Sequence, residues 1–203
     1  MNSNNLILAI DTSCDETSVA VTWKNRVLSN VMSSQVELHK KYGGVFPTVA
    51  KRAHEENIDH VIQEALIRAR LTILKIIAQN NDNEFIKNIS KNLKPSKKFS
   101  NEIKTGFDLL DIDAIAVTYG PGLAPALEVG IRKAKWLCKT YKKPLLAINH
   151  LEGHILSPLA KNSLGKGSFK LDEFNKLNYP ILGILVSGAH TELVDISTLG
   201  RYR

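Results

Sequence analysis

Three strand-like segments follow one another at the start of the chain, and the connections between them are too short to contain a helix. The first, LILAID at residues 6–11, is an apolar run that ends on an acid, and the second, TSVAVTW at 17–23, alternates polar and apolar residues. The third, RVLSNVMSS at 26–34, begins after only Lys24 and Asn25. This spacing predicts three consecutive strands.

Helical periodicity begins at Pro47, where the first turn of a helix tolerates proline, and continues to Ala69. Apolar runs and periodic segments further along predict strands at 114–119 and 145–149, helices at 126–141 and 150–161, and strands at 181–187 and 191–196. Strands that alternate with helices in this way are typical of an α/β domain. We therefore expect a mixed sheet flanked by helices.

Positive charge is concentrated in a lysine- and asparagine-rich insertion at about residues 72–108. Between Thr72 and Gly106 there are seven lysines and three acids, in a chain whose net charge is +7. Such a segment is either a solvated insertion or a patch that contacts nucleic-acid phosphates. Lysines alone do not distinguish the two, so the sequence leaves both interpretations open.

The N-terminal segment has neither the basic region of a signal peptide nor an apolar run long enough to cross a membrane. Cys14 and Cys138 have neither the spacing of a zinc site nor that of a disulfide framework, which is typical of a reducing compartment. We therefore expect a cytoplasmic protein without a membrane partner.

Three turns have the composition of ligand contacts. The turn DTSCDETS at 11–18 offers hydroxyls and backbone amides that can cradle a phosphate, or it is an ordinary polar hairpin. The turns GPGL at 120–123 and SGA at 187–189 contain glycine, which allows the backbone to come close to a ligand. The helix expected after GPGL directs its positive end toward the same space. Each pattern is weak by itself.

His150 and His154 lie four positions apart in the segment INHLEGHIL. If a helix begins at or just before His150, both imidazoles lie on one face and can bind the same ion. Glu152 then points elsewhere, so it is a candidate for orienting a ligand or partner. Two histidines at a helix start also make ordinary hydrogen bonds without a metal. The spacing leaves both interpretations open.

Five segments of the chain carry a family resemblance: LAIDTSCDETSVAV, SSQVELHKKYGGVFPTVAKRAH, AVTYGPGLAPALEVGI, INHLEGHILSP and LVSGAHTEL. Together they closely resemble, in the same order, the motifs of the TsaD family of tRNA threonylcarbamoyladenosine synthases, once described as O-sialoglycoprotein endopeptidases. The resemblance covers nearly the whole chain apart from the insertion. It implies an actin-like, ASKHA-type (RNase H-like) fold, with residues 1–203 as the N-terminal lobe and a second, C-terminal lobe outside this chain.

The resemblance also implies a metal site and a nucleotide contact. In the family, the histidines that match His150 and His154 bind one divalent iron or zinc ion, and an aspartate of the second lobe is the third ligand. Ala189 replaces a family glycine and puts a methyl group where backbone should meet ligand closely. Archaeal and eukaryotic members commonly have a metal-binding tyrosine at the position of Leu185, which favours the bacterial or organellar type. The segment implied to contact the adenylate is Leu185, Val186, Ser187, Gly188 and Ala189.

The implied activity is transfer of a threonylcarbamoyl group from threonylcarbamoyl-adenylate to N6 of the adenosine just 3′ of the anticodon, in tRNAs that read codons beginning with A. A metal ion is useful there because it polarises the carbonyl under attack. Asp11, Asp15 and Glu16 are candidates for the base, and Glu16 is preferred because it matches an acid of the family's CDET motif. The expected partners are tRNA, the adenylate, and TsaB-like and TsaE-like subunits.

Two other classes of function are open on the sequence. One is a non-catalytic lobe that pairs with a TsaB-like subunit, although a pure scaffold has no need of ligand histidines. The other is a metallopeptidase, which is least favoured because HLEGH lacks the HExxH order. Since the implied third metal ligand lies outside this chain, we expect the chain to contain half of a site and to be inactive alone.

Overall fold

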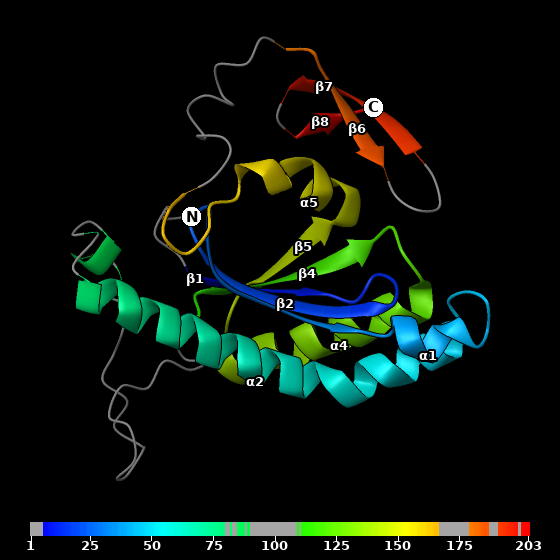
Figure 1. Ribbon diagram of the computed structural model, residues 1–203, viewed down its shortest axis with the longest axis horizontal. Helices are drawn as coiled ribbons and strands as arrows, with labels where there is room; N and C mark the ends of the chain where they lie inside the picture. Colours follow the sequence, from blue (N-terminus) through cyan, green and yellow to red (C-terminus); the bar gives the residue numbers. More distant parts are fainter. Residues whose placement is uncertain are drawn as a thin grey trace.

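The computed structural model describes residues 6–79, 82, 85–87, 89, 109, 111–166, 179–186, 191–198 and 200–203. Figure 1 shows a larger sheet, helices beneath and above it, and a smaller sheet beyond the upper helix. The elements in chain order are β1 (Leu6–Asp11), β2 (Glu16–Trp23), β3 (Arg26–Ser34), α1 (Val36–Lys40), α2 (Pro47–Gln79), β4 (Ala114–Gly120), α4 (Ala124–Tyr141), β5 (Leu145–Asn149), α5 (His150–Leu156), a 3-10 turn η1 (Ser157–Leu159), β6 (Ile181–Val186), β7 (Thr191–Thr198) and β8 (Arg201–Tyr202).

The larger sheet has five strands in the order β3-β2-β1-β4-β5. β1, β2 and β3 pair antiparallel, whereas β4 pairs parallel with β1, and β5 pairs parallel with β4. Short turns join the antiparallel strands, while parallel neighbours need a crossover, which α4 supplies between β4 and β5. The predicted α/β class with a mixed sheet flanked by helices is confirmed.

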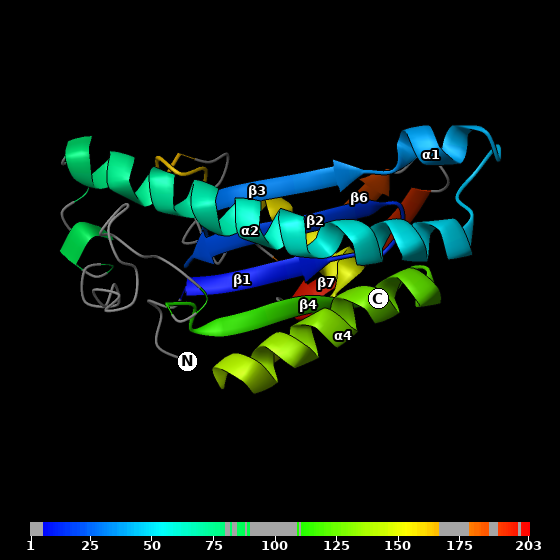
Figure 2. The ribbon, with the colours of Figure 1, turned by 90° about the horizontal axis from the view of Figure 1, so that it is seen from below.

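Helices α2 and α4 cover one face of the five-stranded sheet and lie side by side beneath it (Figures 1 and 2). β1 and β2 alternate strictly, so Leu6, Leu8 and Ile10 point into the core on this face. The facing side of α2 is rich in alanine, which lets the helix approach the strands closely. Each large apolar side chain buried here contributes about 1.5–3 kcal/mol.

The predicted helix from Pro47 is confirmed, and α2 continues ten residues past Ala69 to Gln79. It continues because Ile73 and Ile76 extend the buried stripe into the first part of the predicted insertion. The rest of that insertion lies almost entirely outside the described residues. The prediction of a helix over 150–161 is wrong in its second half, since α5 ends at Leu156 and the 3-10 turn at 157–159 contains a proline.

Strands β6, β7 and β8 form a separate antiparallel sheet of three strands. β6 pairs with β7 along its whole length, from Ile181 opposite Ile196 to Val186 opposite Thr191. Figure 1 shows this sheet on the far side of α5 from β4 and β5. Within the described ranges, no helix has both the length and the apolar character that a membrane span requires.

Candidate functional site

The parallel strands β1, β4 and β5 end at the same edge of the larger sheet, and the candidate site lies there. Asp11 is the last residue of β1, Thr118 lies near the end of β4, and His150 directly follows β5. Ligands of open α/β sheets bind at the carboxyl ends of parallel strands. The strand order therefore brings together side chains that are far apart in the sequence.

His150 is the first residue of α5, because the helix starts without a loop after β5. The side chain of Asn149 caps it by accepting hydrogen bonds from the backbone N–H groups of Leu151 and Glu152, at 2.9 and 3.2 Å. One helical turn later, His154 turns its ring toward His150. The two Nε2 atoms are 3.1 Å apart, which confirms that both imidazoles lie on one face of a helix.

Asp11 holds the other side of the His150 ring. Its Oδ2 atom lies 3.0 Å from His150 Nδ1 and accepts a hydrogen bond from Thr118 Oγ1 at 2.7 Å. Its Oδ1 atom accepts from the backbone N–H of Ser13 at 2.8 Å. Burial alone raises the pKa of Asp11, but hydrogen bonds from His150, Thr118 and Ser13 outweigh it and hold the pKa well below its usual range. The carboxylate therefore stays ionised at neutral pH.

The carboxylate also fixes the state of His150. The hydrogen bond to Asp11 raises the pKa of His150, while partial burial lowers it. A carboxylate that accepts from Nδ1–H leaves Nε2 free for a ligand, which is how carboxylates orient metal-binding histidines in proteins. The Nε2 atom of His150 faces the Nε2 atom of His154.

These two histidines fit a divalent metal ion. Nitrogens bound at about 2.0–2.1 Å to one ion lie about 3.0–3.4 Å apart, and the observed 3.1 Å agrees with this. Imidazoles suit both iron and zinc. The described part of the chain contains no group of three or more His, Cys, Asp and Glu side chains able to hold a metal. Glu152 points away, and its Oε1 accepts from the hydroxyl of Tyr202 at 3.0 Å.

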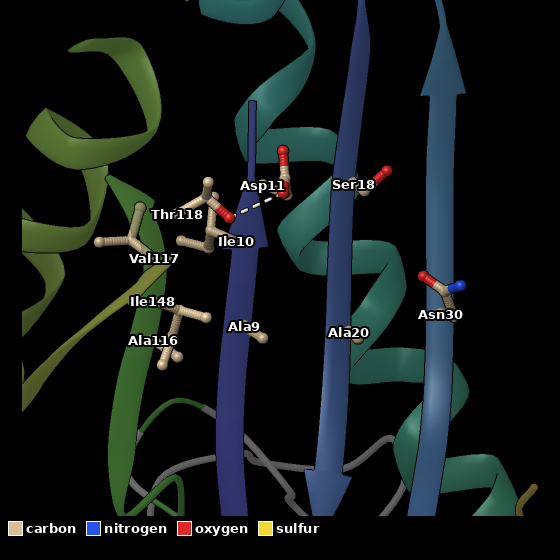
Figure 3. A pocket seen from close by; sticks show the side chains of 10 residues that line it. All are labelled: Ala9, Ile10, Asp11, Ser18, Ala20, Asn30, Ala116, Val117, Thr118 and Ile148. Carbon is tan, nitrogen blue, oxygen red and sulfur yellow. Dashed lines mark hydrogen bonds between the residues drawn. The ribbon is translucent and has the colours of Figure 1, made fainter. Parts of the chain in front are cut away.

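A cavity of about 220 Å³ opens beside the histidines. Asp11, Thr118, His150 and His154 line it together with Ile148, Asn149 and Gly153. No atom lies within 4 Å of the place where a Cβ of Gly153 would stand, so the glycine leaves that wall open. A second hollow of about 180 Å³ continues from Asp11 along the sheet, over the small residues Ala9, Ala20 and Ala116 (Figure 3).

The polar turn between β1 and β2 uses part of its chemistry internally. The hydroxyl of Thr12 donates to the carbonyl of Ala126 and accepts from the N–H of Gly130. The hydroxyl of Thr17 is buried and hydrogen-bonded to His54. These two hydroxyls therefore have protein partners, which favours the ordinary polar hairpin for them. Ser18, by contrast, lies along the hollow in Figure 3.

The backbone of the same turn is held by its carbonyl groups. The Ser13 carbonyl accepts a hydrogen bond from the N–H of Leu123 at 2.7 Å. The Cys14 carbonyl accepts from His54 Nε2 at 3.0 Å, and the Asp15 carbonyl accepts from the N–H of Gln35 at 2.9 Å. In a trans peptide the N–H points opposite to the C=O. The N–H groups of Cys14, Asp15 and Glu16 therefore point away from these donors.

The GPGL turn fits against this backbone only because it contains glycine. A Cβ on Gly122, which has a φ of +154°, would stand 2.5 Å from the carbonyl oxygen of Ser13. This is shorter than any side-chain carbon tolerates, so the glycine lets this turn pack directly against the backbone of the β1–β2 turn. The residue after Gly122, Leu123, donates its backbone N–H to that same carbonyl. The contact with a ligand expected of this turn stays a prediction.

The other predicted site residues are less fully placed. Glu16 is the exposed first residue of β2. Leu185 is half-buried near the end of β6, and Val186, the last residue of β6, is 77% exposed. Ser187, Gly188 and Ala189 lie outside the described residues. Sequence reasoning did not single out Thr118 or Asn149, although their position at strand ends is a signal that could have identified them.

Comparison with known proteins gives one family. A sequence model of that family, described as TsaD, tRNA N6-adenosine threonylcarbamoyltransferase, matches residues 26–78 and 87–203. Curated relatives from Clostridioides difficile (strain 630) and Staphylococcus haemolyticus (strain JCSC1435) bear the name tRNA N6-adenosine threonylcarbamoyltransferase. The first is 40% identical over 201 residues and the second 43% identical over 195 residues. These alignments cover 98% and 96% of this chain.

The chain spans less than half the length of these relatives, 45% of the first and 43% of the second. Among solved structures, YeaZ from Pseudomonas aeruginosa aligns with a TM-score of 0.42 and 19% identity, over 71% of this chain and 43% of that chain. The family's sequence pattern runs from β3 to β8, and the two histidines of its HxEGH motif converge at one edge of the sheet. This chain therefore belongs to the TsaD family.

Proposed function

We propose that this chain is the metal-binding N-terminal part of a tRNA-modifying enzyme. The enzyme transfers a threonylcarbamoyl group from threonylcarbamoyl-adenylate to N6 of an adenosine. That adenosine lies just 3′ of the anticodon in tRNAs that read codons beginning with A. The observation that supports this proposal most is the convergence of His150 and His154 Nε2 at 3.1 Å, with Asp11 behind His150, in a member of this family. We place the reaction in the cytoplasm, where its tRNA substrate is modified.

In this proposal, the chain holds one divalent ion, Fe²⁺ or Zn²⁺, through His150 and His154, and further protein ligands come from the second lobe. When bound, the ion supplies a Lewis acid that polarises the carbonyl of the threonylcarbamoyl group. Asp11 keeps the proton of His150 on Nδ1, so that Nε2 presents a lone pair. The cavity beside Gly153 leaves room for the acyl group next to the two rings.

The other proposed residues bind the adenylate donor or accept the proton that N6 of the adenosine loses. N6 of the adenosine attacks the carbamoyl carbon, the bond from that carbon to the phosphate oxygen breaks, AMP leaves, and a base takes the N6 proton. Glu16 is our candidate base, and it is the exposed first residue of β2, directly after the β1–β2 turn. We propose that the backbone of this turn contacts the phosphate of the adenylate. Leu185, Val186, Ser187, Gly188 and Ala189 are proposed to contact the adenylate.

The test is nucleoside analysis of tRNA after reaction with synthetic adenylate donor, using this chain completed with the second lobe, in cis or as a separate chain. His154→Ala should lose product formation by about a hundredfold or more, because an unpositioned carbonyl forfeits much of the ~7–11 kcal/mol that orientation contributes. His60→Ala, an exposed histidine of α2, is the matched control. Full activity of His154→Ala would refute the metal-site assignment.

A second candidate function is pairing with a TsaB-like subunit, with or without catalysis, and a TsaE-like subunit as a further partner. It is favoured by large apolar side chains on the outer surfaces of the two helices: Ile67 and Leu71 on α2 are 45% and 51% exposed, and Trp136 on α4 is 55% exposed. Leu71→Lys with Trp136→Glu should abolish co-sedimentation with a TsaB-like subunit. Unchanged co-sedimentation would remove this surface from consideration.

The third class of function, a metallopeptidase, gains no support from Glu152. Its carboxylate accepts a hydrogen bond from the hydroxyl of Tyr202 and faces away from the histidines.

A further inference from the structure

Four buried polar side chains form a continuous chain of hydrogen bonds beneath the β1–β2 turn. All four are at most 4% exposed: Thr17 of β2, Gln35 before α1, His39 of α1 and His54 of α2. None of them lines the cavity beside His150. They belong to the sequence segments that resemble the family's motifs, yet the proposed chemistry uses none of them.

The hydrogen bonds run in one direction, and this fixes every tautomer. A carbonyl only accepts, so His54 Nε2 carries a proton and donates to Cys14 O at 3.0 Å. His54 Nδ1 therefore accepts, from Thr17 Oγ1 at 2.7 Å and from Gln35 Nε2 at 3.2 Å. The carbonyl end of the Gln35 amide accepts from His39 Nε2 at 3.2 Å. These partners place the proton of the His54 ring on Nε2 and leave Nδ1 as an acceptor.

The series of hydrogen bonds also ends on a backbone group at its other end, beyond His39. The N–H of Phe46 lies 3.4 Å from His39 Nδ1, which closes the series on the loop between α1 and α2. At the near end, the backbone N–H of Gln35 donates to Asp15 O while His54 donates to Cys14 O. Two adjacent carbonyls of the turn are thus held by residues of this one network.

Stability alone does not explain this choice of residues. Each buried polar atom must find a partner, whereas apolar side chains of the same shape fill such a space at nearly equal stability. What the polar chain adds is direction, because a hydrogen bond restricts the orientation of the peptide it holds. The peptides that it orients are Cys14–Asp15 and Asp15–Glu16, whose N–H groups point away from His54 and from the backbone of Gln35.

We propose that His54 and Gln35 are positioning residues of the transfer reaction, which fix the Cys14–Glu16 peptides so that their N–H groups and the Glu16 carboxylate face the adenylate donor. His39 acts one step behind, by fixing the amide of Gln35. This inference rests on the proposed function for its chemical consequence. Its structural part, the orientation of the turn, is testable without any activity.

The first test is amide hydrogen exchange, measured by NMR on the 203-residue chain. His54→Met removes all three hydrogen bonds of the ring at similar volume, whereas His54→Gln keeps an N–H donor near the position of Nε2. We expect exchange of the Leu123 and Gln35 amides, which donate to the neighbouring carbonyls, to rise about tenfold in His54→Met and to stay within about twofold in His54→Gln. His60→Met, the same change at an exposed site of α2, should leave both amides unchanged.

The second test is steady-state kinetics of the completed enzyme with the same variants. His54→Met should raise KM for the adenylate donor about tenfold or lower kcat by that factor, at equal zinc content and equal folded fraction, and His54→Gln should recover most of the loss. A merely structural role would lower the amount of active enzyme and leave KM unchanged. Gln35→Met, which keeps the bond from His54 to Cys14, should shift the same quantities in the same direction by a smaller factor.

The outcomes separate the two proposals. If the wild-type enzyme forms no product, the proposed function fails, and the exchange of Leu123 still decides whether the network holds the turn. If the wild-type enzyme is active and both His54→Met and Gln35→Met have wild-type KM and kcat, the positioning role is overturned. Should His54→Met fail to fold, Gln35→Met and His54→Gln decide the question by the same measurements.

Discussion

Asp11 is the residue that ties the candidate site to the sheet. It ends β1, accepts a hydrogen bond from Thr118 of the neighbouring strand, and accepts another from His150, the first residue of α5. A carboxylate behind a metal-binding histidine sets both the tautomer and the ring orientation. The two rings of His150 and His154 therefore depend on a residue more than a hundred positions away in the sequence.

Asp11→Asn should weaken zinc binding by the completed enzyme about ten- to a hundredfold, because the amide no longer provides an ionised partner for the Nδ1–H of His150. Competition with a chromogenic chelator measures this affinity. Asp15→Asn, a change of the same size on the adjacent turn, is the control and should bind zinc like the wild type. Equal affinities for both variants would show that Asp11 does not orient the ligand.

Acid should destabilise the fold through His54. Burial lowers the pKa of this ring, outweighing the opposite effects of the Cys14 carbonyl, Asp11 and Asp15, while His39 lowers the pKa further. The unfolded chain therefore binds a proton first as the pH falls below about 6.5, and the free energy of unfolding declines from there downward. Urea denaturation at about pH 7.5 and pH 5.5 should show a smaller decline in His54→Gln than in wild type or His60→Met. Equal declines in all three would contradict the buried neutral ring.

At the scale of elements, the site is built by two turns that touch through their backbones. The GPGL turn donates an N–H from Leu123 to Ser13, and the following helix α4 engages the hydroxyl of Thr12. Helix α2 reaches the other end of the same turn through His54. The β1–β2 turn is consequently positioned by both helices that cover the sheet.

Gly122→Ala should destabilise the chain by at least about 1 kcal/mol, because a Cβ meets the Ser13 carbonyl and a positive φ is unfavourable for alanine. Chemical denaturation measures the loss. Gly44→Ala is the matched control, since no atom lies within 4 Å of the place of its Cβ. If both variants unfold at the same denaturant concentration, the turns are not in close contact.

At the scale of the whole molecule, α5 is the element that contacts both sheets. Its first residue follows β5 directly, and Glu152 accepts from Tyr202 of β8. A cavity of about 500 Å³ lies between α5 and the smaller sheet, lined in part by Tyr119, Glu152 and Tyr202. The helix that carries His150 and His154 is therefore the place where movement of the smaller sheet would reach these two residues.

The 203-residue chain should bind zinc weakly, with Kd above about 1 μM, because the described residues supply two imidazole ligands and durable sites take three or four. Titration calorimetry with wild type and His150→Ala measures it, and the variant should show no binding. The same chain should form no product from donor and tRNA until the second lobe is added. Nanomolar binding that survives His150→Ala would place the metal elsewhere.

The sequence by itself determined the elements and the pair of histidines. Alternation in β1 and β2, helical periodicity after Pro47 and the spacing of His150 and His154 are local patterns, and each reflects the geometry of one strand or one helix. The family motifs are local in the same sense. The end of α5 is signalled in the sequence by Pro158, because a proline inside a helical pattern ends or kinks the helix, and the prediction of a helix to residue 161 did not use this signal.

Only the tertiary structure decided which polar residues face the cavity. The hydroxyls of Thr12 and Thr17 resemble ligand contacts in sequence, but α4 and His54 occupy them. Asp11 and Thr118 meet His150 because β1, β4 and β5 are parallel neighbours, an order that no single segment encodes. Hydrogen bonds between distant segments depend on the relative placement of elements, and that placement follows from packing the whole core, not from the period of any one element.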